Sequence, residues 1–179
     1  MRKIILFVAL ISGMMVMQSC VREEVIVEDT VDHDTISEVW EYTNVDFHPG
    51  NNYSVFLDFH HVIYASDMVL VYHLYDIVNG NDVWRLMPQT YYFNGGGELD
   101  YNFDFTQYDA NVFLDANFDL TTLSPVWTDN QIFRVVVIPA YFGNRMSADS
   151  KETEKVDFNN YEEVIKYFKI DESKIKKIQ

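Results

Sequence analysis

Leu99-Asp100-Tyr101-Asn102-Phe103-Asp104-Phe105-Thr106 alternates large apolar residues with polar residues without a break. The side chains of a β-strand point alternately to its two faces, so this pattern predicts a strand with one buried face and one solvated face. Wound into a helix, the same stretch would divide its apolar side chains between opposite sides. The segment therefore predicts a sheet with a core on one side.

Other segments extend this prediction along the chain. Tyr53 to Phe59 and Val112 to Leu120 have similar mixed patterns, and Trp40-Glu41-Tyr42 begins another. Met68 to Val78 and Phe133 to Ile138 are nearly continuous apolar runs instead, which is typical of strands covered on both sides or central in a sheet. We expect these two runs to form the core.

Turn residues divide the strands. Asn79-Gly80-Asn81-Asp82 separates Met68 to Val78 from Val83-Trp84-Arg85-Leu86-Met87, and Asn-Gly supplies the positive φ angles that a tight hairpin needs. Gly95-Gly96-Gly97 predicts a second reversal, between Tyr91-Tyr92-Phe93 and the strand that starts at Leu99.

Pro88 has no N–H to donate to a ladder, so we expect it at an edge or bulge between Leu86 and Thr90. In total the pattern predicts about seven or eight mostly antiparallel strands with short connections. This arrangement favours an all-β fold, either a β-sandwich or a partly open barrel.

The C-terminal part changes character. Four apolar residues fall at i, i+3, i+4 and i+7, namely Tyr161, Val164, Ile165 and Phe168, and so form one stripe of a helix. Asn160, with Glu163 three residues later, is close to a capping box. The sequence predicts a helix over 160–168 packed on the sheet. A short further turn is expected from Asp171 to Ile178, which would place Lys174, Lys176 and Lys177 near a helix C-terminus.

The first 20 residues differ from the rest of the chain in composition. Arg2 and Lys3 precede an apolar stretch of 14 residues, Ile4 to Met17, and Ser19 stands before Cys20, the only cysteine of the chain. The stretch is shorter than the roughly 20 residues that a spanning helix needs. The segment resembles a bacterial lipoprotein signal peptide with a lipobox, over residues 1–19. That resemblance implies that Cys20 becomes the diacylated first residue; the alternative is an ordinary secretory signal with a coincidental cysteine.

Residues 20–38 are strongly acidic and lack aromatics, so they predict an extended flexible tether ahead of a domain at 39–179. The alternative is a first strand at Val25-Ile26-Val27. Val21-Arg22-Glu23-Glu24 resembles the surface-export signal of Bacteroidota-type lipoproteins. We therefore expect attachment to the outer membrane through lipid on Cys20, with the domain exposed at the surface or facing the periplasm.

Charge excludes one class of partner. Removal of residues 1–19 leaves 160 residues with 11 basic and 28 acidic side chains, a formal charge of −17. Nucleic-acid binding needs basic side chains that displace phosphate counterions, so no nucleic-acid partner is expected. The mature length suits one compact domain.

Metal and cofactor sites are not predicted. Asp115-Ala116-Asn117-Phe118-Asp119 starts like a calcium loop, but Leu120 replaces the glycine and Val126 replaces the glutamate of that motif. A weak calcium site formed by Asp100 and Asp104 beside Asp115 or Asp119 stays a minority hypothesis. His60, His61 and His73 lack the spacing of zinc ligands, and adjacent strand residues point to opposite faces.

No catalytic residue is predicted, because no nucleophile elbow, phosphate loop or dinucleotide motif is present. Ser54, Ser66 and the aspartates leave open a triad or carboxylate pair that forms only in space. Sugar stacking by Trp84, Tyr91, Tyr92 or Trp127 is a further alternative, although strand aromatics more often serve the core. Trp127, between Pro125 and Asp129, is the residue of this group to test first for exposure.

Four segments together resemble an uncharacterised family of Bacteroidota lipoproteins: Val83 to Thr90, Tyr101 to Thr106, Val112 to Ala116 and Arg134 to Pro139. The resemblance covers about residues 40–170 and implies no activity; some members carry collagen-like repeats, which this chain lacks. The leading hypothesis is a non-enzymatic, lipid-anchored binding or structural module of the cell envelope. The alternatives are an envelope glycan-binding module and a hydrolase of a new kind.

Overall fold

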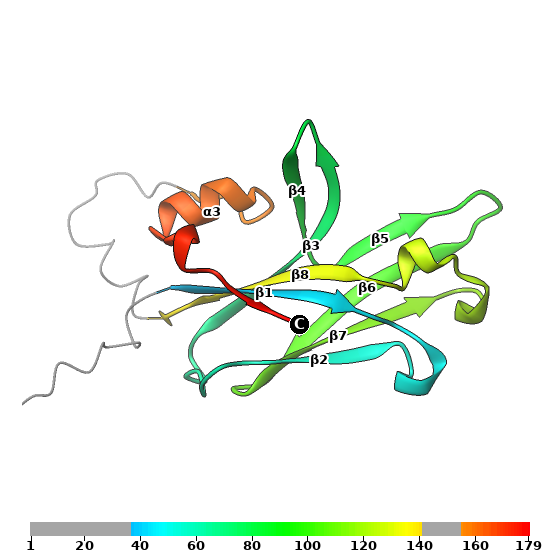
Figure 1. Cartoon of the computed structure of the whole chain (residues 1–179), viewed down its shortest axis with the longest axis horizontal. Helices are drawn as coiled ribbons and strands as arrows, with labels where there is room; N and C mark the ends of the chain where they lie inside the picture. The colour runs from blue at the N-terminus through cyan, green and yellow to red at the C-terminus, as the bar shows by residue number, and fades with distance from the viewer. Residues whose placement is uncertain (1–36, 141–154) are drawn as a thin grey trace, which may run out of the picture. The chain divides into compact units, whose positions relative to one another are not determined.

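A computed structural model describes residues 37–140 and 155–179 (Figure 1). One sheet has the strand order β4-β3-β8-β1-β9, formed by Asn81–Leu86, Met68–Val78, Gln131–Ile138, Glu38–Val45 and Lys176–Ile178. The other has the order β2-β7-β6-β5, formed by Ser54–Asp58, Asp109–Ala116, Glu98–Phe105 and Gln89–Tyr92. The predicted signal peptide, the predicted lipid attachment site at Cys20 and the predicted tether up to residue 36 lie outside the described residues.

The two open sheets pack face to face as a β-sandwich, which confirms the predicted fold class. All strand pairs are antiparallel except β1 with β9, which run parallel. Strand β1 begins at Glu38, one residue before the predicted start of the domain. The described residues also form four single-turn 3-10 helices between these elements: Pro49–Asn51, Leu120–Thr122, Pro125–Trp127 and Glu172–Lys174.

The strand predicted over residues 99–106 is confirmed as β6, but the alternation of buried and solvated residues holds only in its first half, since Phe103 is half-buried and Phe105 is 45% exposed. Leu99 and Tyr101 are fully buried between the sheets, whereas Asp100, Asn102 and Asp104 occupy the alternate positions. The neighbouring strand β7, which was predicted to reach Leu120, ends at Ala116. Asp119 turns the chain instead, because its carboxylate accepts a hydrogen bond from the Thr121 N–H and caps a 3-10 helix.

The centre of the five-stranded sheet, formed by β1, β8 and the first half of β3, is buried on both faces. Along β8, Phe133, Val135 and Val137 join the core between the sheets, while Val136 and Ile138 join a second core beneath the C-terminal helix. The continuous apolar run predicted to form the core is thus explained by its place as a middle layer.

The C-terminal helix α3 (Tyr161–Tyr167) covers that second face. Its predicted start is confirmed, since the Asn160 side chain accepts a hydrogen bond from the Glu163 N–H at 3.2 Å. The carboxylate of Glu163 does not return to Asn160, as a capping box would require; it accepts from the Asp157 N–H at 3.0 Å. Tyr161, Val164, Ile165 and Phe168 form the predicted stripe and pack on the sheet.

The predicted turn over 171–178 is only partly correct. Glu172–Lys174 forms a 3-10 turn, but Lys176 and Lys177 lie in strand β9 and not at a helix C-terminus. Lys177 explains the difference, because its ammonium lies 2.7 Å from the Glu41 carboxylate on the neighbouring strand β1. The Thr43 hydroxyl also donates to the Ile178 carbonyl at 3.2 Å.

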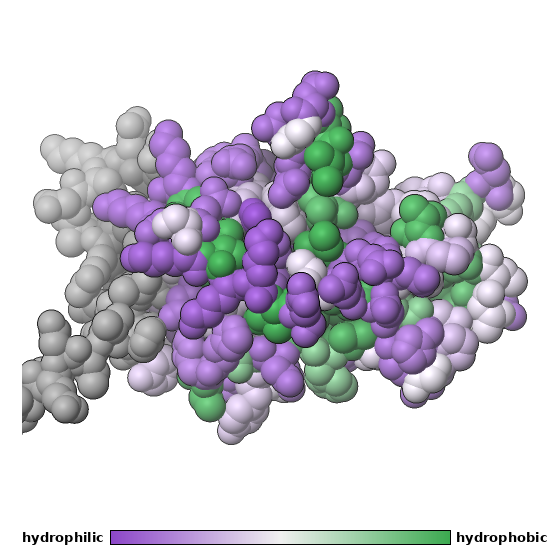
Figure 2. All heavy atoms as spheres, in the orientation of Figure 1, coloured by the Kyte–Doolittle hydropathy of each residue, from purple (hydrophilic) through white to green (hydrophobic). Residues whose placement is uncertain are grey.

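The β3–β4 hairpin forms as predicted, with positive φ at Asn79 and Gly80. The expectation that all of Met68 to Val78 lies in the core is wrong for its second half, since the residues after His73 run out beyond the sandwich. Ile77 and Val78 are 59% and 48% exposed, and Figure 2 shows hydrophobic residues along this projecting hairpin. Pro88 lies between β4 and β5, at the crossing from one sheet to the other.

Glu41 and Arg134 form the main polar contact inside the second core. The Arg134 guanidinium donates to Glu41 through Nε at 2.9 Å and lies 2.8 Å from it through Nη2, and it also donates to the Tyr161 hydroxyl at 2.9 Å. Burial acts to raise the pKa of Glu41, but hydrogen bonds from Lys177 and Arg134 outweigh it and the pKa is lowered. This network joins β1, β8, β9 and α3.

Replacing Glu41 with Ala is expected to lower the free energy of unfolding by about 3 kcal/mol, because the change leaves the guanidinium of Arg134 without its main counter-ion. Urea denaturation of the purified protein measures the effect. Asp171→Asn, which breaks an exposed pair with Lys174, serves as the control and should change the free energy of unfolding far less than Glu41→Ala. Equal losses in the two variants would contradict a structural role for the buried pair.

Candidate functional site

A pocket of about 360 Å³ lies where the middle of β3, strand β5 and the loop before β8 meet. Its wall includes the aromatic rings of Tyr75, Tyr91 and Trp127 and the polar side chains of His73, Asp129 and Gln131. We call it the aromatic pocket. Its volume and its mixture of aromatic and polar groups are typical of small-molecule sites, which span roughly 300–1,000 Å³.

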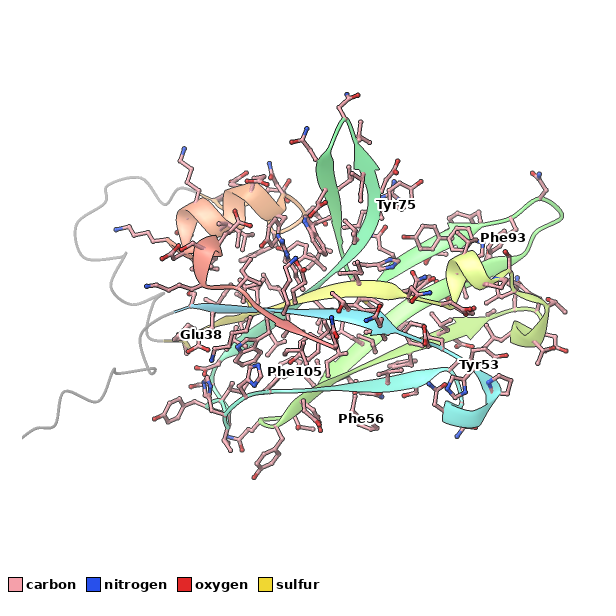
Figure 3. The ribbon with its side chains drawn as sticks, in the orientation of Figure 1. Glu38, Tyr53, Phe56, Tyr75, Phe93 and Phe105 are labelled. Atoms are coloured by element: carbon pink, nitrogen blue, oxygen red, sulfur yellow. The ribbon has the colours of Figure 1, made fainter. Side chains whose placement is uncertain are left out.

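Tyr75 reaches the pocket through an irregularity in its strand. The β3–β4 register pairs Leu74 with Trp84 and Asp76 with Val83, so that Tyr75 has no partner between them. Such a bulge changes the direction of a side chain and is frequent beside functional sites. The Tyr75 ring lies almost parallel to Tyr91, with centroids 6.0 Å apart (Figure 3 labels Tyr75 on the hairpin).

Trp127 forms the opposite part of the wall. Its ring lies 5.0 Å from that of Tyr91 and 5.2 Å from that of Phe93, measured between centroids. Its backbone is fixed to the core, because the Tyr101 hydroxyl donates a hydrogen bond to the Trp127 carbonyl. Trp127, which its place between Pro125 and Asp129 marked as the first of the four aromatics to test for exposure, is half-buried.

The aromatics considered for sugar stacking divide into three groups. Tyr91 and Trp127 meet in the aromatic pocket. Trp84 is buried in the second core beneath α3, so a surface platform at that position was the wrong interpretation. Tyr92 is 76% exposed but follows Tyr91 in the same strand, and it is not part of the pocket wall.

His73 lies at the buried side of the pocket. Its ring is stacked between Tyr101 and Phe133, with centroid distances of 4.7 and 4.9 Å. Its Nε2 lies 2.9 Å from Oε1 of Gln131. The Gln131 amide is oriented by its own N–H groups, which donate to the carbonyls of Val126 and Asp129 at 3.1 and 2.7 Å. Since Oε1 of Gln131 can only accept, the His73 proton is on Nε2 and Nδ1 is a bare acceptor.

Two polar atoms of the pocket residues are buried without a partner. Among the described residues, buried side-chain atoms that form no hydrogen bond occur only at Ser37, His73 and Tyr91. The atoms concerned in the last two are Nδ1 of His73 and the hydroxyl of Tyr91; the latter lies near Arg85 but has no hydrogen bond of good geometry. Leaving a buried polar group without a hydrogen bond costs about 1–3 kcal/mol, so a ligand atom that bonded to either group would recover this cost.

Burial also sets the charge of His73. Its removal from water lowers the pKa to about 4, the hydrogen bond that His73 donates to Gln131 acts in the opposite direction, and the nearby Arg85 lowers the pKa further. The imidazole is therefore neutral at pH 7. Burial likewise raises the pKa of Tyr91, with the charge of Arg85 opposing the change.

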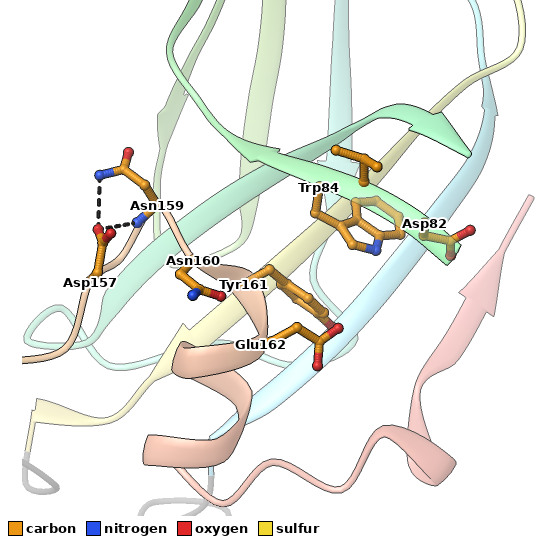
Figure 4. A pocket seen from close by; sticks show the side chains of 8 residues that line it. Asp82, Trp84, Asp157, Asn159, Asn160, Tyr161 and Glu162 are labelled. Atoms are coloured by element: carbon orange, nitrogen blue, oxygen red, sulfur yellow. Dashed lines mark hydrogen bonds between the residues drawn. The ribbon is translucent and has the colours of Figure 1, made fainter. Parts of the chain in front are cut away.

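A second pocket, also of about 360 Å³, lies between β4 and the start of α3 (Figure 4). Asp82, Asp157 and Glu162 supply carboxylates to its wall, but all three are exposed. Asp157 is occupied within its own loop, where it accepts hydrogen bonds from the backbone and side chain of Asn159 at 3.0 Å. A catalytic acid needs a carboxyl group taken out of water, which this pocket does not provide.

The structure does not assemble the other candidate residues into a site. Within residues 37–140 and 155–179, no three His, Cys, Asp or Glu side chains meet as a metal site. Asp100 and Asp115 are opposite each other across β6 and β7, but Asp104 faces Asn111. His60 and His61 contact Trp40, away from His73. Ser54 donates to Asn111 at 2.6 Å, and Ser66 is exposed.

Two residues of the pocket wall, Tyr75 and Gln131, were not singled out by sequence reasoning. The same is true of Arg85, which lies over the Tyr75 ring. The polar run Thr128-Asp129-Asn130-Gln131 directly after Trp127 is the one signal that marks this place. The bulge at Tyr75 leaves no such signal, because its neighbours continue an ordinary strand pattern.

Comparisons of the chain with family models, curated proteins and solved structures found no match. Among the helices of the described residues, none is long and apolar enough to cross a membrane.

Acidification is expected to destabilise the fold through His73. An unfolded histidine binds a proton below about pH 6.5, whereas folded His73 resists protonation down to about pH 4. Stability is thus complete above pH 6.5 and falls as the pH drops from 6.5 to 4, by about 3 kcal/mol from this group. Urea denaturation across this range should show a shallower decline for His73→Phe than for the wild type. The control His60→Gln, at an exposed position, should keep the wild-type slope; a wild-type slope in His73→Phe would contradict the prediction.

Proposed function

We propose that this chain is a lipid-anchored protein of the outer membrane whose folded domain is a non-enzymatic binding module, with the aromatic pocket as its binding site. The observation that carries the proposal is the pocket itself, which is lined by three aromatic rings and by two residues, His73 and Tyr91, that each hold a buried polar atom without a hydrogen bond. The membrane attachment rests on the sequence around Cys20. A domain held at a membrane surface serves well to capture or space another component of the envelope.

A glycan ligand is the second candidate, and a specific observation favours it. Tyr75 and Trp127 present aromatic surface beside the polar groups of Asp129 and Gln131, an arrangement suited to the apolar faces and hydroxyls of a sugar. The hydrolase hypothesis receives less support, because the carboxylates gathered in the second pocket are exposed and one is bound within its loop.

Cys20→Ser is expected to release the protein from the membrane, since lipid attachment requires the thiol and the apolar signal segment is removed on processing. Fractionation of cells into membrane and aqueous phases measures the effect, with Ser19→Ala as a control that keeps a small residue before the cysteine. Firm membrane attachment of the Cys20→Ser protein would contradict the anchor.

Capture of envelope material by the full-length lipidated protein is expected to depend on the aromatic pocket. Trp127→Leu keeps apolar bulk but removes the indole ring, so it should lower the amount captured from intact envelopes at least several-fold. Phe56→Leu, at a 63% exposed position on β2, should leave capture unchanged. Capture that is equal in the two variants would contradict a pocket-centred binding function.

A further inference from the structure

We propose that the aromatic pocket binds one neutral pyranose unit of a glycan, with the C–H face of the sugar on Tyr75 and Trp127 and its hydroxyls directed to His73 and Tyr91. This inference rests on the proposed function, in which the aromatic pocket is the binding site, and it names the class of ligand.

The aromatic rings supply the first argument. Tyr75 is 44% exposed and Trp127 half-buried, so each offers part of its ring to the pocket while packing fixes the rest. The face of an aromatic ring is electronegative and attracts the C–H groups of a saturated ring. Tyr and Trp also combine a large contact area with few rotatable bonds, which lowers the entropy lost on binding.

The hydrogen-bonding groups supply the second argument. Nδ1 of His73 can only accept, because Gln131 holds the ring proton on Nε2. The Asp129 carboxylate on the wall can only accept as well, and the Tyr91 hydroxyl can do both. The pocket therefore calls for a ligand with several donors, and every sugar hydroxyl is both a donor and an acceptor.

Charge excludes the main competitors. An organic cation would suit an aromatic wall in principle, but it would be repelled by the Arg85 guanidinium, which lies 3.3 Å from the centroid of the Tyr75 ring. An anion would meet the Asp129 carboxylate in the wall and the field of a strongly acidic domain. A neutral, hydroxyl-rich ligand meets neither obstacle.

Movement of Tyr75 is part of the proposal. Nδ1 of His73 and the Tyr91 hydroxyl have no access to solvent, so a sugar reaches them only when the outer wall shifts. Tyr75 lies at a bulge where the hairpin leaves the sandwich and is 44% exposed. The shift must also loosen the contacts of its ring with the Tyr91 ring and the Arg85 guanidinium.

Tyr91→Phe separates this role from a structural one. The change deletes the unpaired hydroxyl and keeps the ring, so the unliganded protein should be as stable as the wild type or more stable. Sugar affinity should nevertheless fall about tenfold through the lost hydrogen bond. Tyr92→Phe, the next residue and 76% exposed, is the matched control and should change neither quantity.

Calorimetric titration of the full-length protein tests the inference with four probes: tetrasaccharides of β-linked glucose and of N-acetylglucosamine, a tetragalacturonate, and choline. Binding of a neutral tetrasaccharide, weakened in Tyr91→Phe without a loss of melting temperature, is the expected result. Binding of only choline or the galacturonate, binding of no probe, or equal sugar affinity in Tyr91→Phe would overturn the inference. None of these results touches the binding-module proposal, which fails only if envelope capture is indifferent to Trp127→Leu.

Discussion

Burial of the central strands of the five-stranded sheet on both faces is the constraint on which the rest of the structure depends. Its central strand β8 contributes to the core between the sheets and to the core beneath α3. A layer without water on either side must pair its polar groups internally. Glu41 and Arg134 do so on the helix side, and His73 and Gln131 do so on the other.

The same constraint produces the aromatic pocket. His73 is held between Tyr101 and Phe133, and the amide of Gln131 fixes its tautomer, which leaves one ring nitrogen directed away from that pairing. The bulge at Tyr75 and the fixed backbone of Trp127 then place aromatic rings around it. One ring nitrogen of this neutral histidine, Nδ1, stays without a hydrogen bond because the packing of the surrounding core stabilises the ring in this position.

Local features of the fold could be predicted from the sequence. The strand at residues 99–106, the Asn79-Gly80 turn and the stripe from Tyr161 to Phe168 each depend on neighbours within one element, and each is found in the structure. The parallel pairing of β9 with β1 could not be predicted, because it depends on an ion pair between Lys177 and Glu41 across most of the chain.

The candidate site was less accessible to prediction for the same reason. Its residues come from β3, β5 and the loop before β8, and their spacing along the chain reflects the sheet topology instead of the chemistry of the site. Trp127 and Tyr91 were recognised as aromatics of interest, but their meeting depends on the two sheets facing each other. The bulge that directs Tyr75 and the amide that orients His73 are properties of the folded molecule alone.

The protonation state of the His73 ring tests the central claim most directly, because it reports at once on burial, on the contact with Gln131 and on the free acceptor in the pocket. Long-range ¹H–¹⁵N spectra of the labelled protein at pH 7 are predicted to show a neutral ring with the proton on Nε2 and none on Nδ1. A charged ring at this pH, or a proton on Nδ1, would contradict the account.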